Sequence, residues 1–122
     1  MKKLTLLLAL YILGALNLNA QTVNGVPIEE IDSDYLEILG RVRGTTKIAV
    51  EVDFGQGKKW SSNLTRVNVI KDENGKSIVF NSMIDALNFF SFFGYEFVNA
   101  YAHPVGMTEE VQYHYILRRK EQ

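Results

Sequence analysis

The chain of 122 residues has no cysteine, two prolines and two histidines. The absence of cysteine excludes a disulfide scaffold, a zinc or iron–sulfur site with thiolate ligands, and a cysteine nucleophile. There is no excess of positive charge, because 13 Lys and Arg face 14 Asp and Glu, a formal net charge of −1. A general nucleic-acid binder needs a basic face, so we expect no nucleic-acid partner. The length allows one small domain rather than two.

The first twenty residues have the three-part layout of a secretory signal peptide. Met1-Lys2-Lys3 is a short positive start, Leu4 to Leu16 carries no charge, and Ala20 is a small residue before Gln21. The apolar run is shorter than the roughly 20 residues that a transmembrane helix needs. We therefore expect cleavage after Ala20, export to the periplasm or the extracellular space, and no stable membrane span afterwards. An uncleaved membrane anchor is the alternative.

Removal of residues 1–20 would leave 102 residues with a formal charge of −3, because Lys2 and Lys3 are lost. That length can bury a core without disulfides, since independent folding becomes hard only below about 40 residues. Residues 21–33 contain Gly25 and Pro27 and show no clear period, so we interpret them as an N-terminal arm. Residues 34–122 then form a single domain.

Apolar and polar residues alternate in several segments, which predicts strands. We expect strands over residues 35–43, 46–54, 66–71, 76–80, 95–103 and 111–119. Leu39 breaks the alternation in the first of these segments. Asn74-Gly75 is a strong hairpin signal between the third and fourth.

One apolar segment between these strands predicts a helix over residues 83–93. Asn81 or Ser82 can cap its N-terminus, and Gly94 can end it. Its main apolar face would hold Met83, Ile84, Ala86, Leu87, Phe90 and Phe93. A mostly antiparallel sheet with one helix packed on a face is an α+β fold, which is the fold class we expect.

The last two strands are expected to form an antiparallel hairpin in which paired residue numbers sum to 214. This register places Glu96 opposite Arg118 and Tyr101 opposite Tyr113, which are favourable cross-strand pairs. It puts His103 and His114 on opposite faces. It also gathers five residues on one face, namely Tyr95, Asn99, Tyr101, Tyr113 and Tyr115.

Three segments, FNSMIDALN from Phe80, GYEFV from Gly94 and YHYILRR from Tyr113, carry a resemblance to known proteins. They resemble the C-terminal part of small exported bacterial proteins of unknown function. In those proteins, and in a looser family of short uncharacterised domains, a helix ends at Gly-aromatic-Glu and two strands follow. The looser family usually has Trp where this chain has Tyr95. The resemblance implies an α+β fold with a helix on an antiparallel sheet, and it implies no activity.

The tyrosine-rich face of the final hairpin is the most site-like feature of the sequence. Aromatic side chains with polar tips bind sugars, peptides or partner proteins. The alternative is that this face lies under the helix or another strand, and full burial of Tyr101 and Tyr113 would exclude a platform. His103 and His114 are a second candidate polar site, although surface or packing roles are more usual for such residues.

The remaining polar clusters have ordinary explanations. Glu51 and Asp53 lie two apart on one strand, where a solvated face is more usual than an acid–base pair. The acidic groups at residues 29–34 and 72–74 lack the ligand spacing of a calcium loop. Two histidines without cysteine do not complete a zinc site. We therefore assign no catalytic residue, no metal ligand and no cofactor.

These observations favour an exported module that binds a protein partner or an extracellular ligand without catalysis, with a homodimer as one arrangement. A small hydrolase-like enzyme or an enzyme-inhibitor module of the cell envelope is the alternative, and a subunit of a larger envelope assembly is a third reading. A cleft that holds His103 or His114 beside a carboxylate would favour the enzyme. A flat aromatic or edge-strand surface would favour binding, and an exposed edge strand would support the assembly.

Overall fold

Two antiparallel sheets and one α-helix form the described part of the chain, which in this computed structural model covers residues 20–43, 46–56, 68–104, 106–107 and 111–121. The predicted α+β fold class is confirmed. The expected signal peptide falls outside the described residues except for Ala20, as does the beginning of the strand expected over 66–71.

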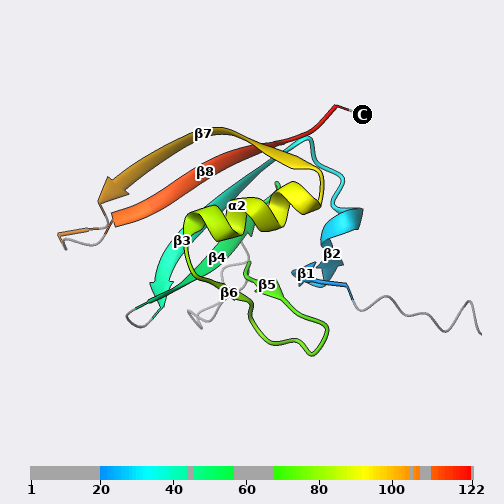
Figure 1. Cartoon of the computed structure of the whole chain (residues 1–122), viewed down its shortest axis with the longest axis horizontal. Coiled ribbons are helices and arrows are strands. Elements are labelled where there is room, and N and C mark those ends of the chain that lie inside the picture. Colours follow the sequence, from blue (N-terminus) through cyan, green and yellow to red (C-terminus); the bar gives the residue numbers. More distant parts are fainter. Residues whose placement is uncertain (1–19, 44–45, 57–67, 105, 108–110, 122) are drawn as a thin grey trace, which may run out of the picture.

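The larger sheet has the strand order β6-β4-β3-β8-β7, and every neighbouring pair is antiparallel. Its strands are β3 (Tyr35–Arg43), β4 (Lys47–Asp53), β6 (Val79–Phe80), β7 (Tyr95–Pro104) and β8 (Val111–Arg119). The predicted boundaries of β3, β4, β7 and β8 are confirmed to within one residue. Figure 1 shows β7 and β8 as the long outer hairpin of this sheet.

The smaller sheet has the order β2-β1-β5 and is built largely from the segment that we interpreted as an arm. Its strands are β1 (Thr22–Val23), β2 (Val26–Pro27) and β5 (Ile70–Lys71), and the 3-10 helix η1 (Ile28–Glu30) follows β2. Val23, Ile28 and Ile31 are buried in the same core as the larger sheet. The predicted turn at Asn74-Gly75 is present, but the strands on either side of it, β5 and β6, belong to different sheets.

The helix α2 (Met83–Phe92) lies across one face of the larger sheet (Figure 1). Of the two predicted caps, Ser82 is the N-cap, because its side chain accepts a hydrogen bond from the Asp85 backbone N–H at 3.2 Å. The prediction that Ile84 belongs to the buried face is wrong, since Ile84 is 62% exposed. A helix turns about 100° per residue, so Ile84 lies around the helix from Met83 on the side away from the buried Ala86.

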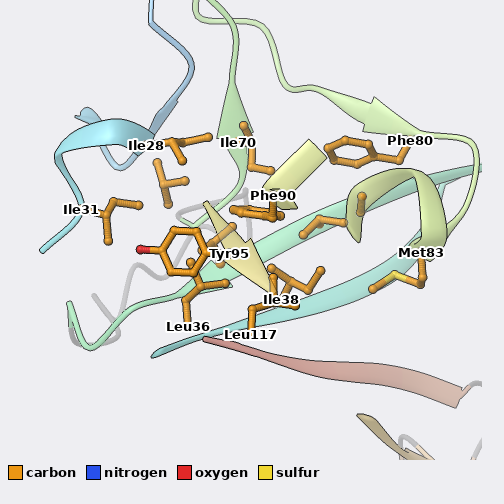
Figure 2. Packing of buried hydrophobic residues seen from close by; sticks show 14 residues of the cluster. Ile28, Ile31, Leu36, Ile38, Ile70, Phe80, Met83, Phe90, Tyr95 and Leu117 are labelled. Carbon is orange, nitrogen blue, oxygen red and sulfur yellow. The ribbon is translucent and has the colours of Figure 1, made fainter. Parts of the chain in front are cut away.

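The core between α2 and the sheet contains Tyr95, the first residue of β7. Figure 2 shows its ring inside the apolar cluster, with the hydroxyl oxygen turned toward the segment of Ile31. The hydroxyl donates a hydrogen bond to the Ser33 carbonyl oxygen and accepts one from Arg119 Nη2, each at 3.1 Å. Tyr95 is therefore a structural residue with a satisfied polar tip rather than part of an exposed platform.

The final hairpin keeps the predicted register only over its first three pairs. Glu96 lies opposite Arg118, and Arg118 Nη2 contacts Glu96 Oε1 at 2.7 Å. An irregularity between Phe97 and Asn99 then inserts one residue into β7, so that Tyr101 pairs with His114 instead of Tyr113. The predicted register is wrong beyond this point. A shift of one residue moves side chains to the other face of a strand, so the predicted faces are wrong there as well.

Candidate functional site

The face of the larger sheet opposite α2, here called the helix-free face, gathers polar side chains from four strands. Residues that pair directly across strands share a face, and Leu39 of β3 pairs with Glu51 of β4 and with His114 of β8. In the same way Glu37 pairs with Asp53, and His103 of β7 pairs with Gln112 of β8. The neighbouring β3 residues Leu36 and Ile38 point into the core.

A cleft of about 260 Å³ opens on the helix-free face. It is lined by Glu37, Leu39, Arg41, Glu51, Val52, Asp53, Asn68, His103, Gln112 and His114. Leu39, with charged or polar side chains on either side of it, supplies an apolar surface at the centre. An apolar surface surrounded by a few placed polar groups is the usual composition of a ligand site.

The wall of the cleft contains a hydrogen-bonded pair, His114 and Glu37. The Nδ1 atom of His114 contacts Glu37 Oε1. Because an ionised carboxylate only accepts hydrogen bonds, Nδ1 carries the proton in this pair. His114 is only 8% exposed, and its other ring nitrogen, Nε2, is buried without a hydrogen-bond partner among the described residues.

Two side chains of β7 stack against the His114 ring. The Tyr101 ring lies 4.5 Å from it, centroid to centroid, with 11° between the planes, and the His103 ring lies 4.7 Å from it. The Tyr101 hydroxyl reaches Glu37 Oε2 at 3.4 Å, a long hydrogen bond. Desolvation, and then the nearby negative charge of Glu37, raise the pKa of Tyr101 above its ordinary value.

Three carboxylates and one guanidinium line the cleft, so its formal charge is −2 while both histidines are neutral. The guanidinium belongs to Arg41, whose Nε contacts Glu51 Oε1 at 3.1 Å. Asp53 Oδ1 accepts a hydrogen bond from the Gly55 backbone N–H at 2.9 Å, which fixes its side chain at the end of β4. Glu37 and Asp53 lie side by side, and among the described residues neither is bound by a lysine or arginine side chain.

A second hollow of about 320 Å³ adjoins the cleft. It is lined by Ser33, Tyr35, Leu36, Glu37, Asp53, Phe54, Gly55 and Ile116. Glu37 and Asp53 line both hollows, and the cleft and the second hollow are together called the groove.

The five residues predicted to share one face are divided between two faces. Tyr95 is in the core, while the half-buried Tyr115 and the 46% exposed Tyr113 lie on the α2 side of β8. Asn99 and the 49% exposed Tyr101 lie on the helix-free face, because the extra residue in β7 reverses the alternation. Burial therefore excludes neither Tyr101 nor Tyr113 from contacting a partner, but the five residues do not form one surface.

The prediction that His103 and His114 lie on opposite faces is wrong for the same reason, and their rings are stacked. The sequence interpretation missed Glu37, Leu39, Arg41, Asn68 and Gln112 as lining residues. One signal was present in the sequence. Leu39 broke the alternation of its strand, and an apolar residue on an otherwise polar strand face marks a place where that face is hollowed or covered.

The described residues set two bounds on the chemistry. Among them, no group of three or more His, Asp or Glu side chains is placed to hold a metal ion. Within the same ranges, no helix combines the length and the apolar character needed to cross a membrane. The residues of the cleft alone carry the functional argument, because comparisons with known protein families, with curated proteins and with solved structures find no match to this chain.

Proposed function

We propose that the protein is a binding module of the cell envelope whose site is the cleft on the helix-free face. The observation that carries this proposal is the cleft of about 260 Å³ itself, in which Leu39 lies among charged and polar side chains. Leu39 offers apolar contact to a ligand, and the polar side chains around it offer hydrogen bonds that can fix the ligand's orientation.

Location and partners are part of the same proposal. The signal-peptide pattern of residues 1–20 supports export, and the resemblance of the C-terminal segments to small exported proteins agrees with it. β7 is the last strand of its sheet, and in the described structure one backbone edge of it faces no other strand. An edge of this kind supports pairing with a second copy or with an assembly partner. The homodimer and the larger assembly stay predictions.

A fragment screen tests the binding site. We expect small polar fragments to shift the backbone amide resonances of cleft residues, and Leu39→Lys to abolish those shifts by placing a charged chain in the cleft. Ile84→Lys is the matched control, since it makes the same change on an exposed position of α2. Fragments that shift only residues outside the helix-free face, or a cleft response that Leu39→Lys leaves intact, would contradict the proposal.

A hydrolase-like enzyme is the second candidate, and one observation favours it. A histidine beside a carboxylate in a cleft is the arrangement that we expected of an enzyme, and His114 and Glu37 form it. With the proton on Nδ1, Nε2 of His114 would be the general base, and because Nε2 is buried in the described structure, the enzyme would require it to become exposed to water. The test is turnover of chromogenic ester, peptide and glycoside substrates, with activity that Glu37→Ala lowers by roughly 10²-fold or more. Absence of turnover in the unchanged protein rejects the enzyme. The enzyme-inhibitor reading has no observation of its own and stays a prediction.

A further inference from the structure

The cleft contains two carboxylates in an arrangement that a sheet normally avoids. Glu37 and Asp53 are direct cross-strand partners on the same face, and like charges in such positions destabilise the strand pair. Among the described residues that line the cleft, Arg41 is the one permanent cation, and it is bound to Glu51 instead. Within the described part of the chain, the negative charge between β3 and β4 therefore has no counter-charge of comparable strength.

The polar atoms at this position are mainly acceptors. An ionised carboxylate offers about four acceptor sites. Glu37 uses some of them for His114 and Tyr101, while Asp53 accepts one hydrogen bond among the described residues, from the Gly55 N–H. A site composed of acceptors requires a ligand composed of donors.

Two chemical classes of donor fit this requirement, and both are cations. An ammonium group has three donors and no acceptor, and a guanidinium has five donors in a planar fork that matches carboxylates. Phosphates and carboxylates carry the wrong charge and no donor. A bare metal ion is not supported, because no group of three ligands is placed for one among the described residues.

The surroundings also suit an organic cation. The ring of Tyr101 lies beside Glu37, is about half exposed and stacks on His114, so an aromatic side chain stands next to the carboxylate at the rim of the cleft. The two hollows that meet at Glu37 and Asp53 leave space on both sides of these carboxylates. A ligand with its charged group at the junction could extend into either hollow.

We infer that the groove binds a ligand through an ammonium or guanidinium group seated between Glu37 and Asp53. This inference rests on the proposed binding function and adds the chemical class of the ligand. The charged group could belong to a small amine or to the lysine or arginine side chain of a peptide, and the chemistry at the carboxylates is the same for both.

The test compares two uncharged-backbone probes, acetyl-arginine methylamide and its citrulline counterpart, by nuclear magnetic resonance titration of the full chain. Citrulline has nearly the same shape without the positive charge. We expect the arginine probe to shift cleft resonances and to bind at least about tenfold more tightly than the citrulline probe. Binding of the arginine probe should also weaken as salt is raised, because the attraction is electrostatic.

Two variants locate the charge that is responsible. Asp53→Asn should weaken the arginine probe about tenfold or more, and its side-chain oxygen can still accept the Gly55 hydrogen bond. Glu73→Gln removes a charge from an exposed turn outside the groove and should leave binding unchanged. A five-residue peptide with a central arginine distinguishes the two sources of the charged group. If the peptide binds more tightly than the single-residue probe, the ligand is a peptide segment, and if the two bind equally, the ligand is a small amine.

The outcomes separate this inference from the proposed function. Equal binding of the arginine and citrulline probes in the cleft, or an unchanged affinity in Asp53→Asn, overturns the cationic ligand and leaves the binding cleft standing. If neutral or anionic fragments shift the resonances of cleft residues and the arginine and citrulline probes do not, the cationic ligand alone is overturned. If no probe and no fragment shifts these resonances, both the cationic ligand and the proposed binding function are overturned.

Discussion

The Glu37 carboxylate on β3 accepts a hydrogen bond from Nδ1 of His114 on the neighbouring strand β8. The bond runs diagonally, because the direct partner of His114 is Leu39, two residues further along β3. The hydrogen bond therefore connects His114 of β8 to β3, the strand that also carries Leu39, the apolar residue of the cleft.

Loss of the Glu37 carboxylate should destabilise the fold by about 1–3 kcal/mol, because Glu37→Ala leaves His114 Nδ1 buried without its acceptor. Glu37→Gln should cost less, since the amide oxygen can still accept. The control is Glu51→Ala, which breaks the more exposed ion pair with Arg41 and should cost no more than about 1 kcal/mol. Urea denaturation measures all three variants. A cost of Glu37→Ala no larger than that of Glu51→Ala would show that the pair does not matter to the fold.

The buried hydroxyl of Tyr95 should make the protein sensitive to alkali. Burial is the main cause that raises the pKa of Tyr95 above its ordinary value of 10.0, Asp34 and Asp32 add to it, and the Arg119 guanidinium opposes it. Below pH 10 both states hold the phenol proton, and this contribution to stability is complete. As the pH rises further, the unfolded chain loses the proton first, so the free energy of unfolding falls until the folded-state pKa is passed.

Tyr95→Phe checks that dependence. It removes two hydrogen bonds and should cost about 1 kcal/mol at neutral pH, and it should flatten the fall in stability above pH 10. Tyr113→Phe serves as the comparison, because Tyr113 is 46% exposed. If the unfolding free energy of Tyr95→Phe and of the unchanged protein falls equally steeply above pH 10, the buried phenol is not responsible.

The Met83 side chain of α2 packs against Gly40 of β3. A Cβ atom at Gly40 would overlap Met83 Sδ and would lie 3.3 Å from Ile48 Cγ2. Gly40→Ala should therefore destabilise the fold by about 1–3 kcal/mol through overpacking. Met83→Ala removes the obstructing side chain, so the double variant should lose less than the sum of the two single changes. Additive losses in a double-mutant cycle would mean that the helix does not rest on this glycine.

The extra residue in β7 should be visible in nuclear Overhauser contacts across the final hairpin. Cross-strand contacts of Tyr101 should be with His114, and those of Ala102 with Tyr113. Deletion of Val98 should restore the simpler register, separate Tyr101 from His114 and weaken any fragment binding in the cleft. Contacts of Tyr101 with Tyr113 in the unchanged protein would restore the register that the sequence pattern predicts, and would remove the tyrosine from the site.

Much of the fold was predictable because its signals are local. The alternation in β3 and β4, the cap at Ser82 and the stop at Gly94 depend on neighbours in sequence, and each is found where the pattern indicates. Asn24-Gly25 carried the same hairpin signal as Asn74-Gly75, and both of its residues have positive φ, as a type I′ turn requires. It went unrecognised because the strands that it joins have only two residues each.

The site was not predictable from the same signals. No residue type near Val98 marks an insertion in β7. The insertion is stabilised by contacts between strands, because it lets Tyr101 and His103 stack against His114. The extra residue in β7 places Tyr101 and His103 on the helix-free face beside Glu37. Simple alternation along β7 would place both on the opposite face. Leu39 is the lining residue that stood out in the sequence, since it breaks the alternation of its strand, but that break alone does not predict a cleft.

The most direct test of the central claim is a crystal structure of the protein soaked with acetyl-arginine methylamide. We predict guanidinium density on the helix-free face, within hydrogen-bond distance of the side-chain oxygens of both Glu37 and Asp53. Guanidinium density at another surface, or an unchanged groove at a probe concentration that saturates the resonance shifts, would contradict the account.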